Sequence, residues 1–227
     1  MAQDDLFWWE EADRYFERNR QTTEIEDICF HDIDEILRIL SSHSADINDV
    51  LEIGSSSGRK LEKLCRGFEA RGSGVDPSAL AIEEGKSRLQ ETDQQIEFFR
   101  ALSKDLPFSD HKFDLVLLGF FLYVEDRASL PTTLIEADRV LKGGGFLIIR
   151  DFAPELPHAR IYKHDNRLLS FKNNYSRFFL SLGHYVSVAY IPFDRNGAVG
   201  FELDEDYREQ LVILQKKVVP YPLVGDA

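Results

Sequence analysis

Apolar residues along the chain follow two alternating patterns from position 33 onward. Side chains spaced three or four residues apart indicate helices, and short continuous apolar runs indicate strands that are buried on both faces. Helical spacing is seen over 33–40, 61–68, 81–89 and 130–141. Apolar runs are seen at 49–53, 96–99, 114–118 and 146–150, and the small-residue segment 72–76 is interpreted as a further strand between them. Strands and helices therefore alternate, which predicts a doubly wound α/β fold with crossover helices on both faces of a parallel sheet.

The two ends of the chain depart from this alternation. The aromatic and charged opening predicts an amphipathic helix over 5–20. Residues 154–183 are polar and aromatic, and a helix is expected within them at 176–180. Two later apolar runs, at 185–191 and 210–214, predict strands joined by a polar loop.

Composition narrows the class of protein. The 227 residues are enough for one well-buried domain, and 43% apolar with 30% charged residues is ordinary for a soluble globular chain. A net charge of -13 would repel a phosphate backbone, so no nucleic-acid partner is expected. We expect a cytoplasmic location without membrane segments, because the opening lacks the pattern of a secretory signal and the two cysteines, Cys29 and Cys65, resemble small buried hydrophobes.

The candidate ligand-binding residues lie where the first two predicted strands end. In an open parallel sheet, ligands bind beyond the carboxyl ends of the strands, and Glu52 through Gly58 lies there. Gly54 allows a tight turn and a close approach of the backbone to a ligand, while Gly58 keeps the start of the next helix free of a crowding side chain. Asp76 ends the second strand, where an acid accepts hydrogen bonds from ribose hydroxyls. These positions predict a nucleoside site.

The residue before the turn distinguishes between kinds of nucleoside. A dinucleotide needs an anion-free helix start, usually with the spacing G-x-G-x-x-G. Here Glu52 precedes Gly54 and the spacing is G-x-x-x-G. A carboxylate there would repel a pyrophosphate and attract an ammonium group, so S-adenosylmethionine fits better than NAD. An NAD-linked oxidoreductase is therefore disfavoured.

Five segments in this order resemble the motifs of class I S-adenosylmethionine-dependent methyltransferases. They are Val50–Gly58, Gly74–Ser78, Asp105–Phe108, Phe113–Val116 and Arg139–Gly145. The resemblance covers about residues 49–151 and implies a mostly parallel, Rossmann-like sheet of seven strands with an antiparallel C-terminal pair. It also implies a cofactor site made by Glu52, Gly54, Ser55, Ser56, Gly58, Asp76, Pro77, Leu102, Ser103 and Gly119.

Two positions depart from the family pattern. Ser56 replaces the usual middle glycine of the first motif, and Leu102 stands where many relatives have an acid that accepts a hydrogen bond from the adenine amine. Ser103 or a backbone carbonyl would have to replace that acid. These departures keep open an alternative in which the chain is a non-catalytic cofactor-binding or interaction domain.

The acceptor of the methyl group is less clearly marked. The flanks 9–19 and 162–176 resemble methyltransferases found with glycan and nucleotide-sugar biosynthesis proteins, which implies a polar small-molecule acceptor such as a sugar or sugar nucleotide. We expect 154–183 to form the acceptor site, with His164, Lys172 and Tyr175 as candidate catalytic residues. A methylated oxygen and a methylated nitrogen both remain open.

Simpler roles exist for several of these residues. His164 also suits a solvated loop, Asp114 suits a local cap, and the aromatic residues of 5–20 suit packing on the domain. His158, His164 and Asp165 do not have a recognised metal-ligand spacing, so no metal is expected. The predicted organisation is 1–48 as N-terminal helices that form a lid, and 49–227 as the methyltransferase domain with the acceptor insertion at 154–183.

Overall fold

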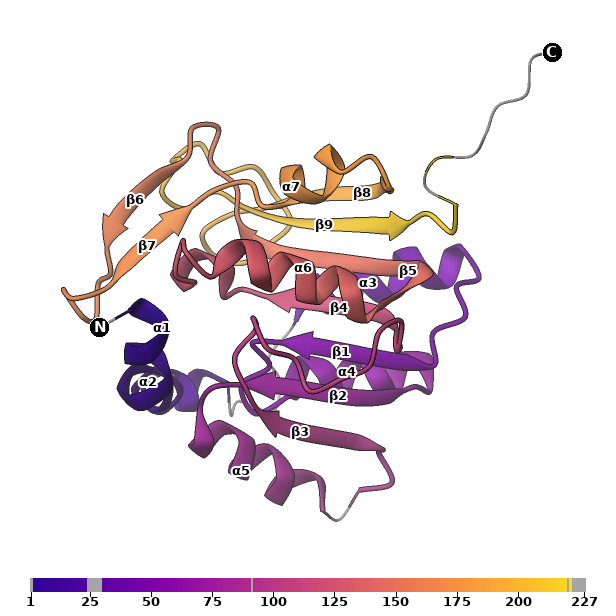
Figure 1. The fold of residues 1–227 in the computed structure, drawn as a ribbon, viewed down its shortest axis with the longest axis horizontal. Helices are drawn as coiled ribbons and strands as arrows, with labels where there is room; N and C mark the ends of the chain where they lie inside the picture. The colour runs from indigo at the N-terminus through magenta and orange to yellow at the C-terminus, as the bar shows by residue number, and fades with distance from the viewer. Residues whose placement is uncertain (1, 24–29, 91, 220, 222–227) are drawn as a thin grey trace.

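A computed structural model describes residues 2–23, 30–90, 92–219 and 221, and within them one large sheet carries the fold (Figure 1). The strands are β1 Asp49–Ile53, β2 Arg71–Asp76, β3 Ile96–Arg100, β4 Phe113–Gly119, β5 Leu141–Phe152, β6 His158–Ile161, β7 Leu169–Lys172, β8 Tyr185–Phe193 and β9 Glu209–Lys216. The helices are α1 Gln3–Leu6, η1 Phe7–Glu11, α2 Ala12–Thr23, α3 His31–Ser42, α4 Arg59–Phe68, α5 Ala79–Leu89, η2 Leu122–Val124, α6 Leu130–Val140 and α7 Ser176–Ser181.

The large sheet has seven strands in the order β3-β2-β1-β4-β5-β9-β8. Neighbours from β3 to β5 are parallel, and β9 pairs antiparallel with both β5 and β8. The predicted fold class is confirmed, including the antiparallel C-terminal pair. Because the chain moves outward from β1 to β3 and then returns to β4 on the other side of β1, a crevice opens at the carboxyl ends of β1 and β4.

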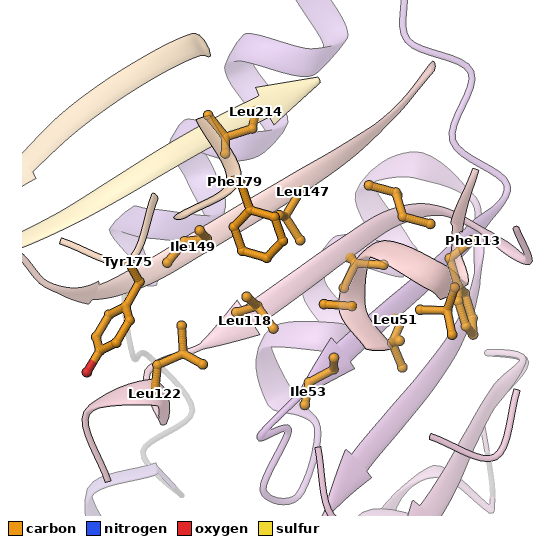
Figure 2. Packing of buried hydrophobic residues seen from close by; sticks show 14 of the residues in the cluster. Leu51, Ile53, Phe113, Leu118, Leu122, Leu147, Ile149, Tyr175, Phe179 and Leu214 are labelled. Carbon is orange, nitrogen blue, oxygen red and sulfur yellow. The ribbon is translucent and has the colours of Figure 1, made fainter. Parts of the chain in front are cut away.

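Alternation along the central strands divides the core into two layers. Leu51, Leu118 and Leu147 point to one face, where helix α6 and residues of α7 cover them, as Figure 2 shows for part of this cluster. Leu117 and Ile148 point to the opposite face, which α3 and α4 cover. Strands buried on both faces need apolar residues at every position, which explains their continuous apolar runs.

Strand β5 begins earlier than its sequence pattern suggests. Leu141 has helical spacing with the residues before it, and the three glycines after it suggest a stop. In the structure α6 ends at Val140 and Leu141 already pairs with Phe113 of β4. The register then shifts between Phe113 and Leu115, and Gly144 has a φ of 86°. The glycines therefore allow an irregular extension of the strand, because residues without a Cβ tolerate such backbone conformations.

Residues 154–183 contain strands that the sequence pattern does not reveal. Strands β6 and β7 form a separate antiparallel pair, and His158 lies opposite Lys172. The residues of β6 are exposed or half-buried, so the ribbon lacks the apolar alternation that marks a covered strand. The expected helix at 176–180 is present as α7.

The N-terminal segment runs as successive helical turns through α1, η1 and α2. Figure 1 shows these turns beside the edge of the sheet toward which the arrows of β1 to β4 point. Asp13 accepts hydrogen bonds from the Ser78 hydroxyl and the Leu80 backbone at the start of α5. The Gln3 side chain donates to the carbonyl oxygens of Val124 and Leu169. The segment is thereby held over the crevice.

Candidate cofactor and acceptor site

A cavity of about 540 Å³ lies at the carboxyl ends of β1, β2, β4 and β5. This volume is typical of sites for small molecules. All ten residues expected to bind the cofactor line it, namely Glu52, Gly54, Ser55, Ser56, Gly58, Asp76, Pro77, Leu102, Ser103 and Gly119. The structure therefore brings the predicted cofactor positions together, although they come from separate turns of the chain.

The turn after β1 depends on backbone conformations that favour glycine. Gly54 and Gly58 have φ angles of 76° and 77°. A Cβ on Gly54 would lie 2.8 Å from the ring of Phe121, and one on Gly58 would lie 2.4 Å from the ring of Phe98. Ser56 between them also adopts a positive φ, 50°, so the residue that replaces the usual glycine occupies a strained conformation.

Asp76 is oriented by this same turn. One carboxylate oxygen accepts a hydrogen bond from the Ser56 backbone at 2.8 Å, and the other accepts one from the Ser78 backbone at 2.8 Å. Burial raises the pKa of Asp76 to about 6, against the lowering effect of these two hydrogen bonds. Each carboxylate oxygen retains a further lone pair, so Asp76 can still accept hydrogen bonds from a ligand in the cavity.

Glu52 has an unsatisfied oxygen in the cavity wall. Its side chain is only 2% exposed, and Oε2 has no hydrogen-bond partner among the described residues. Burial raises the pKa of Glu52 to about 8, although the positive charge of Lys60 acts in the opposite direction. A buried carboxylate without a partner is costly, and a bound ammonium group would supply both a charge and a hydrogen-bond donor. The amino-acid tail of S-adenosylmethionine fits this requirement.

Glu125 is a buried acid that the sequence pattern did not indicate. It lines the cavity together with Leu102, the second departure from the family pattern. The Ser103 hydroxyl donates to Glu125 at 2.9 Å, and the Thr133 hydroxyl donates to the other oxygen of Glu125 at 2.7 Å. Burial raises the pKa of Glu125 to about 7. Glu125 follows η2 in a polar stretch, so its sequence carries no signal of burial. Leu102 and Ser103 line the cavity with it.

The N-terminal helices form one wall of the cavity. Phe7, Tyr15 and Phe16 line it together with Tyr123, which lies in the same hydrophobic cluster as Tyr15. Arg100 on β3 donates to the Trp8 carbonyl at 3.0 Å, and its guanidinium lies 4.3 Å from the centre of the Trp8 ring. These contacts place the predicted helix over the crevice, and its role as a lid stays a prediction.

On the side of β5, the cavity is lined by Phe120 and Arg150. Phe120 has a φ of 62°, which is an outlier for a bulky residue. Arg150 follows a run of buried apolar residues in β5 and is itself only 6% exposed. A charged residue at the end of such a run, close to the ligand-binding edge of a sheet, was the signal in the sequence that could have identified it.

The candidate catalytic residues lie elsewhere. His164, Lys172 and Tyr175 do not line the cavity in the described part of the chain. Lys172 donates to the Asp206 carbonyl, and the fully buried Tyr175 donates to the Phe171 carbonyl at 2.5 Å and accepts from Arg127 at 3.0 Å. These contacts favour structural roles for Lys172 and Tyr175. The catalytic assignment of all three residues stays a prediction.

Other side chains have local explanations. Asp114 accepts hydrogen bonds from the Asn48 and Asp49 backbones and pairs with Lys142, so it caps the start of β1. Cys65 is buried and free, and Cys29 lies outside the described residues. No cluster of three potential metal ligands occurs in the described ranges. Within those ranges, none of the helices combines the length and apolar character needed to cross a bilayer.

Comparison with known proteins relates the central part of the chain to methyltransferases. A family model described as a methyltransferase domain matches residues 50–145. The demethylmenaquinone methyltransferase of Clavibacter sepedonicus is 37% identical over 109 residues, which is 40% of this chain and 42% of the relative. The 2-phytyl-1,4-naphtoquinone methyltransferase of Nostoc punctiforme is 34% identical over 121 residues, covering 51% of this chain and 52% of the relative. The chain thus spans about half the length of these curated relatives, or less.

Solved structures agree at the level of the fold. The 1,6-didemethyltoxoflavin-N1-methyltransferase of Burkholderia thailandensis, with bound 1,6-didemethyltoxoflavin and S-adenosylhomocysteine, has a TM-score of 0.68. The match covers 95% of this chain and 87% of that one at 17% identity. The sheet order, the turn after β1 and the matched motifs lead to one conclusion: residues 50–145 of this chain match a methyltransferase domain, and the chain shares its fold with solved S-adenosylmethionine-dependent methyltransferases.

Proposed function

We propose that this protein transfers the methyl group of S-adenosylmethionine to a small molecule. The unpartnered oxygen of Glu52 is the main support for the proposal, because a bound ammonium group would supply the missing hydrogen-bond donor at the carboxyl end of β1. Asp76 lies on the neighbouring strand with its carboxylate fixed by the same turn. A ligand with an ammonium on one side and ribose hydroxyls on the other satisfies both acids.

Each part of the cofactor then has a place in the cavity. Glu52 binds the ammonium of the tail, and Asp76 accepts hydrogen bonds from the ribose. Leu102 packs against the adenine, and Ser103, backed by Glu125, takes the place of the acid that Leu102 replaces. The bound cofactor supplies a methyl group activated by a sulfonium charge, so the protein has mainly to align the acceptor and exclude water.

We propose further that the acceptor is a planar aromatic molecule. Its support is the lining of the cavity, which includes seven aromatic side chains: Phe7, Tyr15, Phe16, Phe30, Phe120, Phe121 and Tyr123. Two relatives are named for the methylation of demethylmenaquinone and of a naphthoquinone. The expectation of a sugar nucleotide came from the flanks 9–19 and 162–176, but His164, Lys172 and Tyr175 do not line the cavity.

The N-terminal helices act as the lid in this proposal. They contribute aromatic wall residues, and their polar contacts to α5 and η2 hold them closed. A closed lid excludes water from the sulfonium and keeps the acceptor in line with the methyl group.

Calorimetry with S-adenosylhomocysteine tests cofactor binding. The Asp76→Ala variant should lose about 1.5–3 kcal/mol of binding free energy because a charge-assisted hydrogen-bond acceptor is removed. The exposed Glu97→Gln on β3 serves as the matched control and should bind as wild type does. Wild-type protein that binds NAD and not S-adenosylhomocysteine would contradict the proposal.

Transfer of a labelled methyl group tests the acceptor class. Incubation with naphthoquinols, phenols and nucleotide sugars should label the aromatic compounds. Labelling of a nucleotide sugar alone would overturn the aromatic assignment. Cofactor binding without transfer to any compound in a broad panel would favour the non-catalytic alternative.

A further inference from the structure

Arg150 occupies a distinctive position at the edge of the cavity. It lies on β5 opposite Gly119 of β4, which places it one strand beyond the predicted cofactor residues on β2, β1 and β4. Its side chain is 6% exposed and lines the cavity. An arginine is seldom buried to this degree unless its charge is paired or used.

Neighbouring acids hold the Arg150 guanidinium in place. Nη2 donates to Glu209, and Nε lies 3.9 Å from a carboxylate oxygen of Asp32, which also pairs with Lys60. The guanidinium carbon lies 4.4 Å from the centre of the Phe193 ring. These contacts fix the orientation of the fork before any ligand arrives, so little conformational entropy is lost when a ligand binds.

One nitrogen of the Arg150 guanidinium lacks a hydrogen-bond partner in the part of the chain that the structure describes. Nη1 of Arg150 is buried and has no hydrogen-bond partner among the described residues. A buried donor without an acceptor is destabilising, and an anionic oxygen is the strongest acceptor that could satisfy it. The positive charges of Lys60 and Arg150 are balanced by Asp32 and Glu209. Nη1 therefore offers a ligand a directed hydrogen bond and adds little net positive charge.

The residue beside Arg150 suggests the shape of the ligand. Phe120 donates its backbone N–H to the Arg150 carbonyl at 2.8 Å, and its ring centre lies 5.3 Å from the guanidinium carbon. The positive φ of Phe120 is a strained conformation, which is characteristic of functional sites. An aromatic face next to a buried hydrogen-bond donor suits a flat ring that carries an acidic oxygen.

We propose that Arg150 Nη1 binds an anionic oxygen, a carboxylate or phenolate, on the planar acceptor, and that Phe120 packs against the acceptor ring. The proposal rests on the proposed methyl transfer and adds the charge of its substrate. An anionic acceptor also complements the positive sulfonium of the cofactor, since the two opposite charges are brought together in a cavity with little water. Arg150 is here a substrate-positioning residue.

A pair of matched probes tests the charge preference. The compounds 2-naphthoate and 2-naphthamide share a flat ring system and differ in charge, and their binding is measured by calorimetry with S-adenosylhomocysteine at saturation. Wild-type protein should bind the naphthoate about tenfold more tightly, which corresponds to about 1.4 kcal/mol. Arg150→Gln should remove most of that preference and leave the naphthamide affinity within about twofold, because only the charged contact is lost.

Two further variants serve as controls for the Arg150→Gln measurement. Arg38→Gln removes an exposed arginine that pairs with Glu35 on α3, and it should retain the naphthoate preference. Arg150→Lys keeps a positive charge beside Glu209 and loses the planar fork, so it should fold even if Arg150→Gln does not. Its naphthoate preference should be clearly smaller than that of wild type.

Three results would overturn the proposal. They are the absence of a naphthoate preference in wild-type protein, an unchanged preference in both Arg150 variants, and a loss of S-adenosylhomocysteine affinity in those variants while the naphthoate preference persists. The last result would assign Arg150 to the carboxylate of the cofactor tail. If wild-type protein fails to bind S-adenosylhomocysteine, the proposed methyl transfer fails, and the same comparison of probes without cofactor still tests Arg150 by itself.

Discussion

The carboxylate of Asp13 lies 2.6 Å from the Ser78 hydroxyl and joins the N-terminal helices to the start of α5. Ser78 is the N-cap of α5 and also accepts a hydrogen bond from the Ala81 backbone. The N-terminal wall of the cavity and helix α5, which begins just after Asp76, are therefore joined by one small network. Opening of the proposed lid would break it.

Removal of this link should loosen the lid without unfolding the sheet. For Asp13→Ala we expect a loss of about 1 kcal/mol, comparable to the loss of a helix cap, and faster hydrogen exchange within residues 2–23. Hydrogen exchange followed by mass spectrometry measures the effect. Glu17→Ala, at an exposed site one turn further along α2, is the control. Equal exchange in both variants would argue against an anchoring role for Asp13.

Cofactor binding should release a proton from Glu52. The pKa of this buried carboxyl is raised to about 8, so it is mostly protonated at pH 7, and a bound ammonium favours the ionised form. Affinity for S-adenosylhomocysteine should therefore rise as the pH increases from 6 to 8.

Calorimetry at pH 7 in buffers with different ionisation enthalpies measures this proton. Wild-type protein should release nearly one proton, whereas Glu52→Gln should release much less and bind more weakly. Proton release that is unchanged in Glu52→Gln would locate the titrating group elsewhere.

Glu125 should make the free energy of unfolding fall as the pH rises, whereas a carboxylate in a surface ion pair makes it rise. Its pKa is raised to about 7, so the folded state holds the proton more tightly than the unfolded state. The stability from this group is fully present below its ordinary pKa and is lost as the pH rises through about 7. Between pH 6 and 8 the loss should be about 1 kcal/mol.

Urea unfolding at several pH values measures that loss. The Glu125→Gln variant should show a smaller decrease over the same range because the amide cannot ionise. Glu97→Gln, at an exposed position on β3, should follow the wild-type curve. A variant curve for Glu125→Gln that parallels wild type would show that Asp151 or Glu52, whose pKa values are also raised, dominates the effect.

Tyr175 offers a test of the catalytic expectation for 154–183. Its hydroxyl donates to Phe171 and accepts from Arg127 in the core, so Tyr175→Phe should lower the free energy of unfolding by about 1–3 kcal/mol. Binding of S-adenosylhomocysteine and turnover per folded molecule should be preserved. Turnover that falls far more than the folded fraction would restore Tyr175 as a catalytic candidate.

The features that the sequence predicted correctly are local in the chain. Central parallel strands show continuous apolar runs, and helices show apolar residues every three or four positions, so β1, β4, the apolar part of β5 and their helices could be located without a structure. The turn from Glu52 to Gly58 was equally visible, because its small residues and its acid are adjacent in sequence. Strand ends in a parallel sheet meet at one edge, and this placed Asp76 beside them.

The remainder of the site depended on contacts between distant segments. Ser103 meets Glu125 across 22 positions, whereas Tyr15 packs near Tyr123 and Arg150 approaches Asp32 across more than a hundred. Neither the burial of Glu125 nor the unpartnered nitrogen of Arg150 can be inferred from neighbouring residues, because both result from packing between elements. For the same reason His164, Lys172 and Tyr175 looked suited to chemistry in sequence, while the tertiary fold placed them outside the cavity. Sequence alone thus determined the scaffold and the turn after β1, and tertiary packing decided which side chains from distant segments line the cavity.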